Sequence, residues 1–136
     1  MSKLIIYTDG GARGNPGPAG IGVVVYDESG ENILKQIGEY IGERTNNHAE
    51  YTALIRGLNE AVALGASKVD FYLDSELVVK QLLGKYKIRE ENLQKLAGEA
   101  LRLARNFENV EYFHVPREKN KLADKLVNQA LDAAGF

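Results

Sequence analysis

Four acidic residues stand at places where the chain could gather carboxylates for metal-ion chemistry. Asp9 follows the apolar run Leu4–Thr8 and precedes two glycines, and Glu50, Asp74 and Asp124 each lie next to a predicted strand end or helix start. Carboxylates that converge repel one another and raise each other's pKa values unless cations neutralise them. Convergence therefore predicts a divalent-metal site. Two ions roughly 4 Å apart suit in-line displacement at phosphorus, which is phosphodiester chemistry.

The composition limits which metal such a site could take. The sequence has no cysteine and only two, well-separated histidines. These counts exclude thiolate zinc sites and disfavour an imidazole cage. Oxygen ligands point to Mg²⁺, with Mn²⁺ able to substitute.

Length and composition predict one ordinary globular domain over residues 1–136. The apolar and charged fractions are 44% and 26%, and no apolar run approaches the roughly twenty residues that a membrane span needs. Met1-Ser2-Lys3 runs directly into the first predicted strand with no leader pattern, so we expect a cytoplasmic protein without a membrane partner.

The net charge bears on the partner. A formal charge of −2 argues at first against nucleic acid, because phosphate binding usually leaves a basic footprint. Two divalent ions would cancel the four negative charges of the acids, which leaves the rest of the molecule with a charge of +2. The objection weakens, and nucleic acid stays a candidate partner.

Hydrophobic periodicity predicts an α/β fold. The predicted strands are residues 4–9, 19–27, 32–41, 68–73 and 110–115, and the predicted helices are 47–65, 74–83, 93–104 and 122–134. The first three strands form an antiparallel meander, and the later alternation implies right-handed parallel crossovers that place the first, fourth and fifth strands side by side. Ligands of such sheets gather at the carboxyl ends of the parallel strands, where Asp9 and Asp74 stand.

Each acid also has a plain structural alternative. Asp9 before two glycines suits a turn, and Glu50 could form a capping box with Asn47. Asp74 could cap the helix that it precedes, and Asp124 in a first turn would be favoured by the helix dipole. Four unrelated caps have no reason to fall at neighbouring strand ends, so we favour the shared site.

The acids stand in blocks that resemble, in order and spacing, the four signature blocks of the ribonuclease H family, type 1. The blocks are Thr8–Gly11, Thr45–Glu50, Leu73–Ser75 and Asn120–Asp124, and the resemblance covers almost the entire chain. It implies a five-stranded mixed sheet of order 3-2-1-4-5 flanked by helices. It also implies that the four acids are metal-binding catalytic carboxylates of an endoribonuclease, which cleaves the RNA strand of RNA/DNA hybrids and leaves 3′-hydroxyl and 5′-phosphate ends.

Other positions resemble the substrate contacts of the family. They are the backbone of Gly11 and Ala12, the amides Asn15, Asn46, Asn47 and Gln81, and Thr45 beside DNA-strand phosphate. Short amides and bare backbone suit hydrogen bonds to 2′-hydroxyls and base edges in a minor groove. Loop and cap roles are the alternatives, above all for Asn15 and Thr45. Arg117 could contact phosphate, or it could be a solvated loop arginine.

The sequence departs from the family pattern at two places. The loop 116–119 lacks the histidine that many members carry, and residues 80–95 lack the extra helix of a basic protrusion. The chain therefore resembles the short, archaeal-like forms, some of which also accept double-stranded RNA. We expect a monomer. The missing histidine leaves open a catalytically weak module that binds hybrid or double-stranded RNA. A phosphatase with Asp9 as nucleophile would need a second acid where the chain has Gly11.

Overall fold

The computed structural model describes residues 3–136. Met1 and Ser2 lie outside the described residues, and the predicted direct entry into the first strand rests partly on them. The strands are β1 (Lys3–Ala12), β2 (Gly17–Tyr26), β3 (Ile33–Arg44), β4 (Lys68–Leu73) and β5 (Asn109–His114). The helices are α1 (Asn46–Ala63), α2 (Glu76–Leu82), α3 (Glu91–Ala104) and α4 (Lys121–Ala133), with a short 3-10 helix, η1 (Arg117–Lys119), before α4. Within residues 3–136, none of these helices has the length and apolarity to cross a bilayer.

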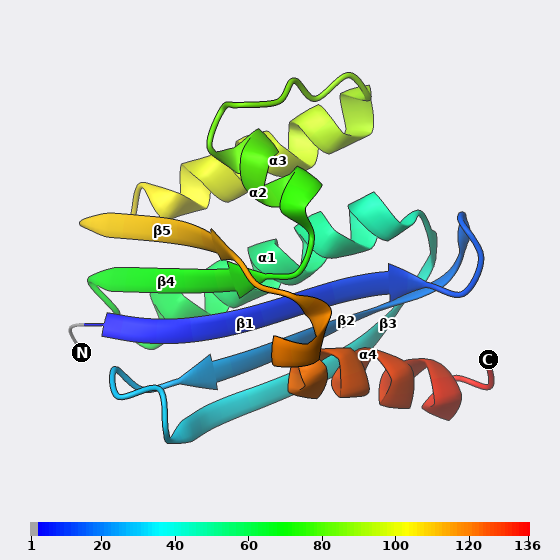
Figure 1. Ribbon diagram of the computed structural model, residues 1–136, viewed down its shortest axis with the longest axis horizontal. Helices are drawn as coiled ribbons and strands as arrows, with labels where there is room; N and C mark the ends of the chain where they lie inside the picture. Colours follow the sequence, from blue (N-terminus) through cyan, green and yellow to red (C-terminus); the bar gives the residue numbers. More distant parts are fainter. Residues whose placement is uncertain (1–2) are drawn as a thin grey trace.

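The five strands form one mixed sheet in the order β3-β2-β1-β4-β5, which confirms the predicted order. β1, β2 and β3 make the antiparallel meander, while β4 pairs in parallel with β1 and β5 in parallel with β4 (Figure 1). The parallel strands β1 and β4 therefore end at the same edge of the sheet.

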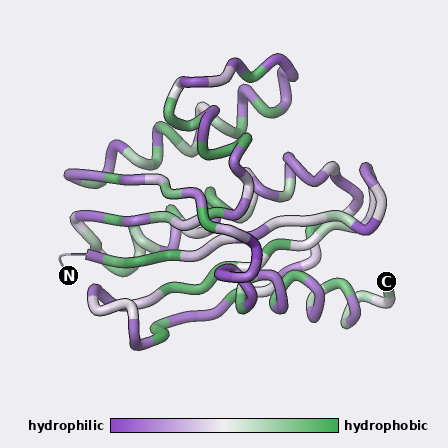
Figure 2. Tube along the Cα trace, viewed as in Figure 1, coloured by the Kyte–Doolittle hydropathy of each residue, from purple (hydrophilic) through white to green (hydrophobic). Residues whose placement is uncertain are grey.

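Helices cover the two faces of this sheet unequally. α1, α2 and α3 lie on one face, and α4 lies on the other, against β1, β2 and β3 (Figure 1). The main core is between the sheet and α1, where Leu4, Ile6 and Phe71 of the strands and Leu54 and Leu58 of the helix are fully buried. α3 and α4 alternate between hydrophobic and hydrophilic residues along their length, as helices with one buried face do (Figure 2).

β1 is longer than predicted, because Gly10 and Gly11 continue the strand instead of ending it. β2 pairs with β1 as far as Ala12, whereas β4 ends at Leu73, opposite Thr8. The last four residues of β1 therefore extend past the end of β4. The same extension explains why β3 reaches Arg44, since β2 begins at Gly17, which pairs with that residue.

Glycines let a helix backbone press on each face of the sheet beside Asp9. A Cβ added to Gly10 would lie 2.2 Å from the carbonyl carbon of Ala49 in α1. On the opposite face Gly22 is the β2 partner of Asp9, and a Cβ there would lie 2.1 Å from the carbonyl oxygen of Ala123 in α4. These contacts bring the acids that follow Ala49 and Ala123 to the end of β1.

We expect Gly22→Ala to lower the free energy of unfolding by about 1–3 kcal/mol, because the new methyl group would collide with the backbone of α4. The matched control is Gly98→Ala in α3, where no described atom beyond the neighbouring residues and backbone of the same helix lies within 4 Å of the added Cβ. That change should raise the free energy of unfolding by about 0.5–1 kcal/mol through helix propensity. Urea unfolding measures both, and equal effects would contradict the close contact.

Candidate active site

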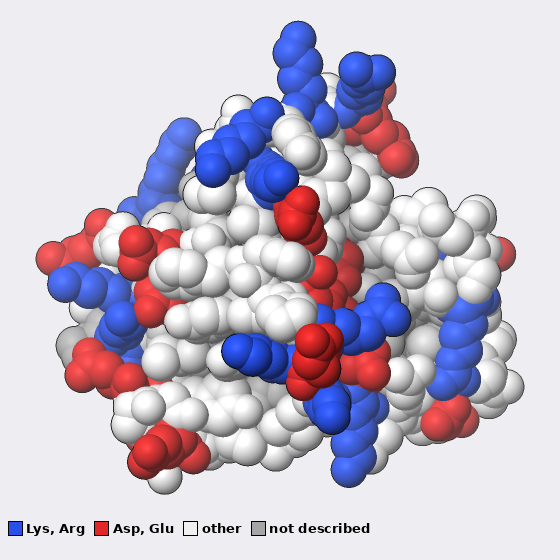
Figure 3. Space-filling model, viewed as in Figure 1, with Lys and Arg blue, Asp and Glu red and all other residues white. Residues whose placement is uncertain are grey.

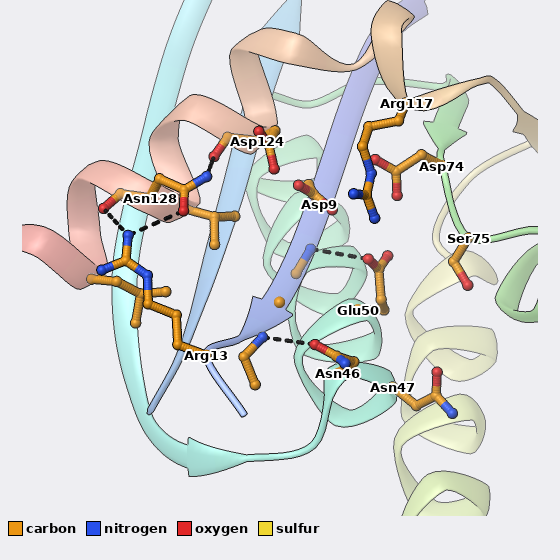
Figure 4. Close-up of a pocket in the computed structure, with 15 residues that line it drawn as sticks. Asp9, Arg13, Asn46, Asn47, Glu50, Asp74, Ser75, Arg117, Asp124 and Asn128 are labelled. Carbon is orange, nitrogen blue, oxygen red and sulfur yellow. Dashed lines mark hydrogen bonds between the residues drawn. The ribbon is translucent and has the colours of Figure 1, made fainter. Parts of the chain in front are cut away.

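A cavity of about 410 Å³ opens where β1 and β4 end, and all four predicted acids line it (Figure 4). Asp9 comes from β1, Glu50 from α1, Asp74 from the residue after β4, and Asp124 from the first turn of α4. Three layers of the fold therefore supply the carboxylates: the sheet and a helix from each face.

Asp9, Glu50 and Asp74 form the tightest group. Each offers one carboxylate oxygen, and these three oxygens lie within 4.8 Å of one another. Asp9 is 7% exposed and Glu50 6%, while Asp74 is half-buried. Asp124 lies outside this group of three but faces the same cavity.

Side chains of α1 take the place of a strand beside the end of β1. The N–H of Gly10 donates to Oε1 of Glu50 at 3.3 Å, and the N–H of Ala12 donates to Oδ1 of Asn46 at 2.8 Å. Residues two apart on a strand point their N–H groups to the same side, and here that is the side where β4 has ended. The contacts satisfy two backbone donors and orient Glu50 toward the cavity.

The capping alternatives for Glu50 and Asp74 are wrong. Thr45 caps α1 and Ser75 caps α2, with their hydroxyl oxygens accepting backbone N–H groups at 3.2 and 3.3 Å. The turn alternative for Asp9 also fails, since the residue lies inside β1. Asp124 does lie in a first turn, so the helix dipole can act on it as well.

Crowding and burial act together on the acids. Burial, and then the charge of Asp74, raises the pKa of Asp9 from its usual 3.8 to about 7, with Asp124 adding a further repulsive charge. Burial, and then the charges of Asp9 and Asp74, raises the pKa of Glu50 well above its usual value. The protein therefore holds carboxylates in a place where their charged forms are unfavourable without a cation.

The positions of the carboxylate oxygens are suitable for binding a divalent metal ion. Oε2 of Glu50 is buried and has no hydrogen-bond partner among the described residues. Two oxygens that bind one Mg²⁺ at about 2.1 Å lie at most about 4.2 Å apart. The three carboxylate oxygens lie within 4.8 Å of one another, so small side-chain shifts would let them share one ion. Asp9, Glu50 and Asp74 could hold one such ion, and Asp124 could extend the site.

Asn120 connects three of the elements that carry acids. Its side chain is buried, and Nδ2 donates to the carbonyl oxygen of Thr8 at 2.9 Å and to Oδ2 of Asp74 at 3.3 Å. Its backbone carbonyl oxygen accepts the N–H of Asp124 at 3.1 Å. Asn120 belongs to the fourth signature block, but the sequence predicts no role for it, because its side-chain partners are 112 and 46 positions away.

The predicted substrate contacts fall into two groups. Those that line the cavity are Gly11, Ala12, Asn46, Asn47 and Arg117. Asn15, Thr45 and Gln81 lie outside that lining in the described part of the chain, and each holds structure together. Oδ1 of Asn15 accepts the N–H of Asn46 at 3.0 Å, and Oε1 of Gln81 accepts the hydroxyl of Tyr51 at 2.7 Å. Their contact with substrate stays a prediction.

Three polar side chains that line the cavity were not predicted from the sequence, those of Arg13, Ser75 and Asn128, and neither were the lining residues Gly10, Val127 and Leu131. Asn128 carried a usable signal, because it is four positions after Asp124 and so on the same helix face. Arg13 carried none, since its partners lie more than a hundred residues away.

A mixed sheet in this order, with carboxylates at the end of its central strand, defines a ribonuclease H-like fold. A profile of the family described as Reverse transcriptase-like matches residues 7–130. The ribonuclease HI of Halobacterium salinarum is 42% identical over 132 residues, which cover 97% of this chain and 66% of that protein. The bifunctional protein Rv2228c of Mycobacterium tuberculosis is 47% identical over 132 residues, but this chain spans only 36% of its length.

Solved structures agree with these relatives. A crystal structure of LC11-RNase H1 in complex with RNA/DNA hybrid matches with a TM-score of 0.91 at 48% identity, over 96% of this chain and 98% of that one. The chain therefore belongs to the ribonuclease H family, as its four sequence blocks predicted. The halobacterial relative agrees with the predicted archaeal-like form.

The raised pKa of Asp9 predicts how stability depends on pH without metal. In the unfolded chain Asp9 titrates near 3.8, so between about pH 4 and 7 the folded state binds more protons and stability falls as pH rises. The free energy of unfolding falls by at most about 4 kcal/mol through Asp9, and the fall is complete above pH 7. Asp9→Asn should remove most of this loss in urea unfolding with a chelator present.

The matched control for that prediction is Asp70→Asn. Asp70 is as buried as Asp9 but pairs with Lys3 at 2.8 Å, so its neutralisation should destabilise the protein near pH 7. A parent protein whose stability does not fall between pH 4 and 7 would contradict the assigned cause.

Proposed function

We propose that this chain is a metal-dependent endoribonuclease that hydrolyses the RNA strand of RNA/DNA hybrids and leaves 3′-hydroxyl and 5′-phosphate ends. The observation that carries the proposal is the convergence of Asp9, Glu50 and Asp74 within 4.8 Å, with Asp124 lining the same cavity. Family membership and a relative crystallised in complex with RNA/DNA hybrid support the same substrate.

The four carboxylates would hold two Mg²⁺ or Mn²⁺ ions when substrate is bound. The ions would lower the pKa of the attacking water and stabilise charge on the leaving 3′ oxygen. The protein's part is to fix the carboxylates: β1 and its contact from Gly10 hold Asp9 and Glu50, and Asn120 holds Asp74. This preorganisation avoids moving charged side chains during the reaction.

Groups beside the acids fit a minor groove that displays 2′-hydroxyls. Gly11 and Ala12 present backbone without large side chains, and Asn46 and Asn47 add amides at the same cavity. Oδ1 of Asn46 is taken by Ala12, so its NH₂ group is the part that would donate to substrate. Double-stranded RNA also displays 2′-hydroxyls, and we propose it as a second, weaker substrate.

The expected monomer and cytoplasmic location stay predictions.

The alternative function is a hybrid-binding module of the same fold with weak turnover. The observation that favours it is the loop before α4, where η1 presents Arg117, Glu118 and Lys119 but no histidine. Arg117 lines the cavity and could bind phosphate, yet a guanidinium does not give up a proton near neutral pH.

Asp9→Asn should lower cleavage of a labelled hybrid by at least about a hundredfold, because it removes a central metal ligand. In the presence of a chelator, the Asp9→Asn variant should bind the hybrid as tightly as the parent or more tightly, since one charge that repels phosphate is gone. The parent and the variant are assayed with Mg²⁺ on hybrid, duplex RNA and duplex DNA.

The outcomes of this assay separate the two functions. Undiminished cutting by Asp9→Asn would overturn the assignment of the site. Tight hybrid binding by a parent protein that does not cut would favour the binding module.

Basic residues on the connector between α2 and α3 predict the salt dependence of binding. Lys and Arg side chains gather at the top of the view over this connector, where Lys85, Lys87 and Arg89 are exposed (Figure 3). Replacing all three with alanine should reduce the slope of log affinity against log salt by about 0.9 for each phosphate that the variant no longer neutralises. Lys68→Ala, at the opposite end of β4, is the control and should leave the slope unchanged.

A further inference from the structure

Arg13 reaches from the β1–β2 loop across to α4. Its Nη2 donates to Oδ1 of Asn128 at 3.1 Å and to the Asn128 carbonyl oxygen at 3.4 Å (Figure 4). Its Nη1 pairs with Asp132 at 2.9 Å and donates to the carbonyl oxygen of Phe136. One guanidinium therefore binds several oxygens in the second half of α4 and just beyond it.

Asn128 connects Arg13 to the turn of α4 that carries Asp124. Its Nδ2 donates to the carbonyl oxygen of Asp124 at 3.1 Å, so the two ends of one amide join the guanidinium to the backbone of the acid. Arg13 and Asn128 also line the cavity that the acids line (Figure 4).

The remaining contacts of α4 with the sheet give it less directional support. Gly22 and Gly38 face carbonyl groups of the helix, at Ala123 and Leu126. The buried side chains of Val127 and Leu131 add apolar contacts, which are not directional. The charge-assisted hydrogen bonds of a planar guanidinium, by contrast, constrain both the distance and the orientation of the groups that they join. Asn120 supplies a second anchor, at the first residues of the helix.

The same loop also holds the helix on the other face. Asn15, two residues after Arg13, accepts the N–H of Asn46 at the start of α1. Within three residues the loop therefore contacts both α1 and α4, which supply Glu50 and Asp124 from opposite faces of the sheet.

We propose that Arg13 is a positioning residue for the candidate metal site, acting through Asn128 to fix the turn of α4 that carries Asp124. The inference rests on the proposed function, because it assigns Arg13 to the same site. Asp124 is the acid outside the tight group of three, so its place relative to Asp9 depends on how α4 is held.

The test is a calorimetric titration of the full chain with Mn²⁺, without substrate. Arg13→Ala and Asn128→Ala should each weaken Mn²⁺ binding by about tenfold, the usual effect of removing a partner that orients metal ligands. The matched control is Asp132→Ala, which removes the ion pair of Arg13 but leaves its contact with Asn128. This variant should bind Mn²⁺ like the parent.

A double-mutant cycle tests whether the effect passes through Asp124. In an Asp124→Asn background, Arg13→Ala should cause no further loss of Mn²⁺ affinity. A loss that persists in this background, or an equal loss in Asp132→Ala, would overturn the proposal. So would unchanged Mn²⁺ affinity combined with a raised KM for hybrid, which would make Arg13 a substrate contact.

Amide hydrogen exchange separates this inference from the proposed function. In metal-free protein, Arg13→Ala should speed exchange in residues 124–132 relative to the parent and to Asp132→Ala. A parent that neither binds Mn²⁺ nor cuts hybrid would end the proposed function. Unchanged exchange in α4 would reject the positioning role, whatever the metal titration shows.

Discussion

Repulsion among buried carboxylates is the constraint on which the rest of this structure depends. In the unfolded chain, water stabilises the charged forms of Asp9, Glu50 and Asp74 separately. The fold removes much of that water and sets three carboxylate oxygens within 4.8 Å of one another. Folding gains nothing from this cluster, so the hydrophobic core beneath it must supply the stability. A cluster that is unfavourable for folding is characteristic of a functional site.

The unequal lengths of β1 and β4 make the cluster geometrically possible. The last residues of β1 pair with β2 on one side. Because β4 ends at Leu73, their backbone donors on the other side face no strand in the described part of the chain. Glu50 and Asn46 accept two of those donors. The hydrogen bonds that complete the backbone of β1 therefore also hold a metal-ligand candidate, and the glycine at position 10 is what lets α1 approach closely enough to make them.

Sequence alone predicted the strand order and four acids that the structure brings to one cavity. It mistook Gly10 and Gly11 for the end of a strand, because their pairing with β2 and the approach of α1 are tertiary effects. The same limit applies to Glu50, whose backbone partner is 40 positions away. Amides such as Asn15 have chemistry that suits both a substrate contact and a structural contact, and the fold shows the structural contact.

The acids are held in two different ways, and this difference shapes the site. Asp9 and Glu50 lie at a direct junction between β1 and α1, where a short hydrogen-bonded path joins their elements. Asp124 is held from the opposite face, by backbone packing on glycine and by a path through Asn128 to the β1–β2 loop. A change at Arg13 can therefore move the fourth acid, whereas Asn15 of the same loop holds the start of α1, which carries Glu50. The site is best described as a fixed group of three with one acid whose position the surrounding helix contacts set.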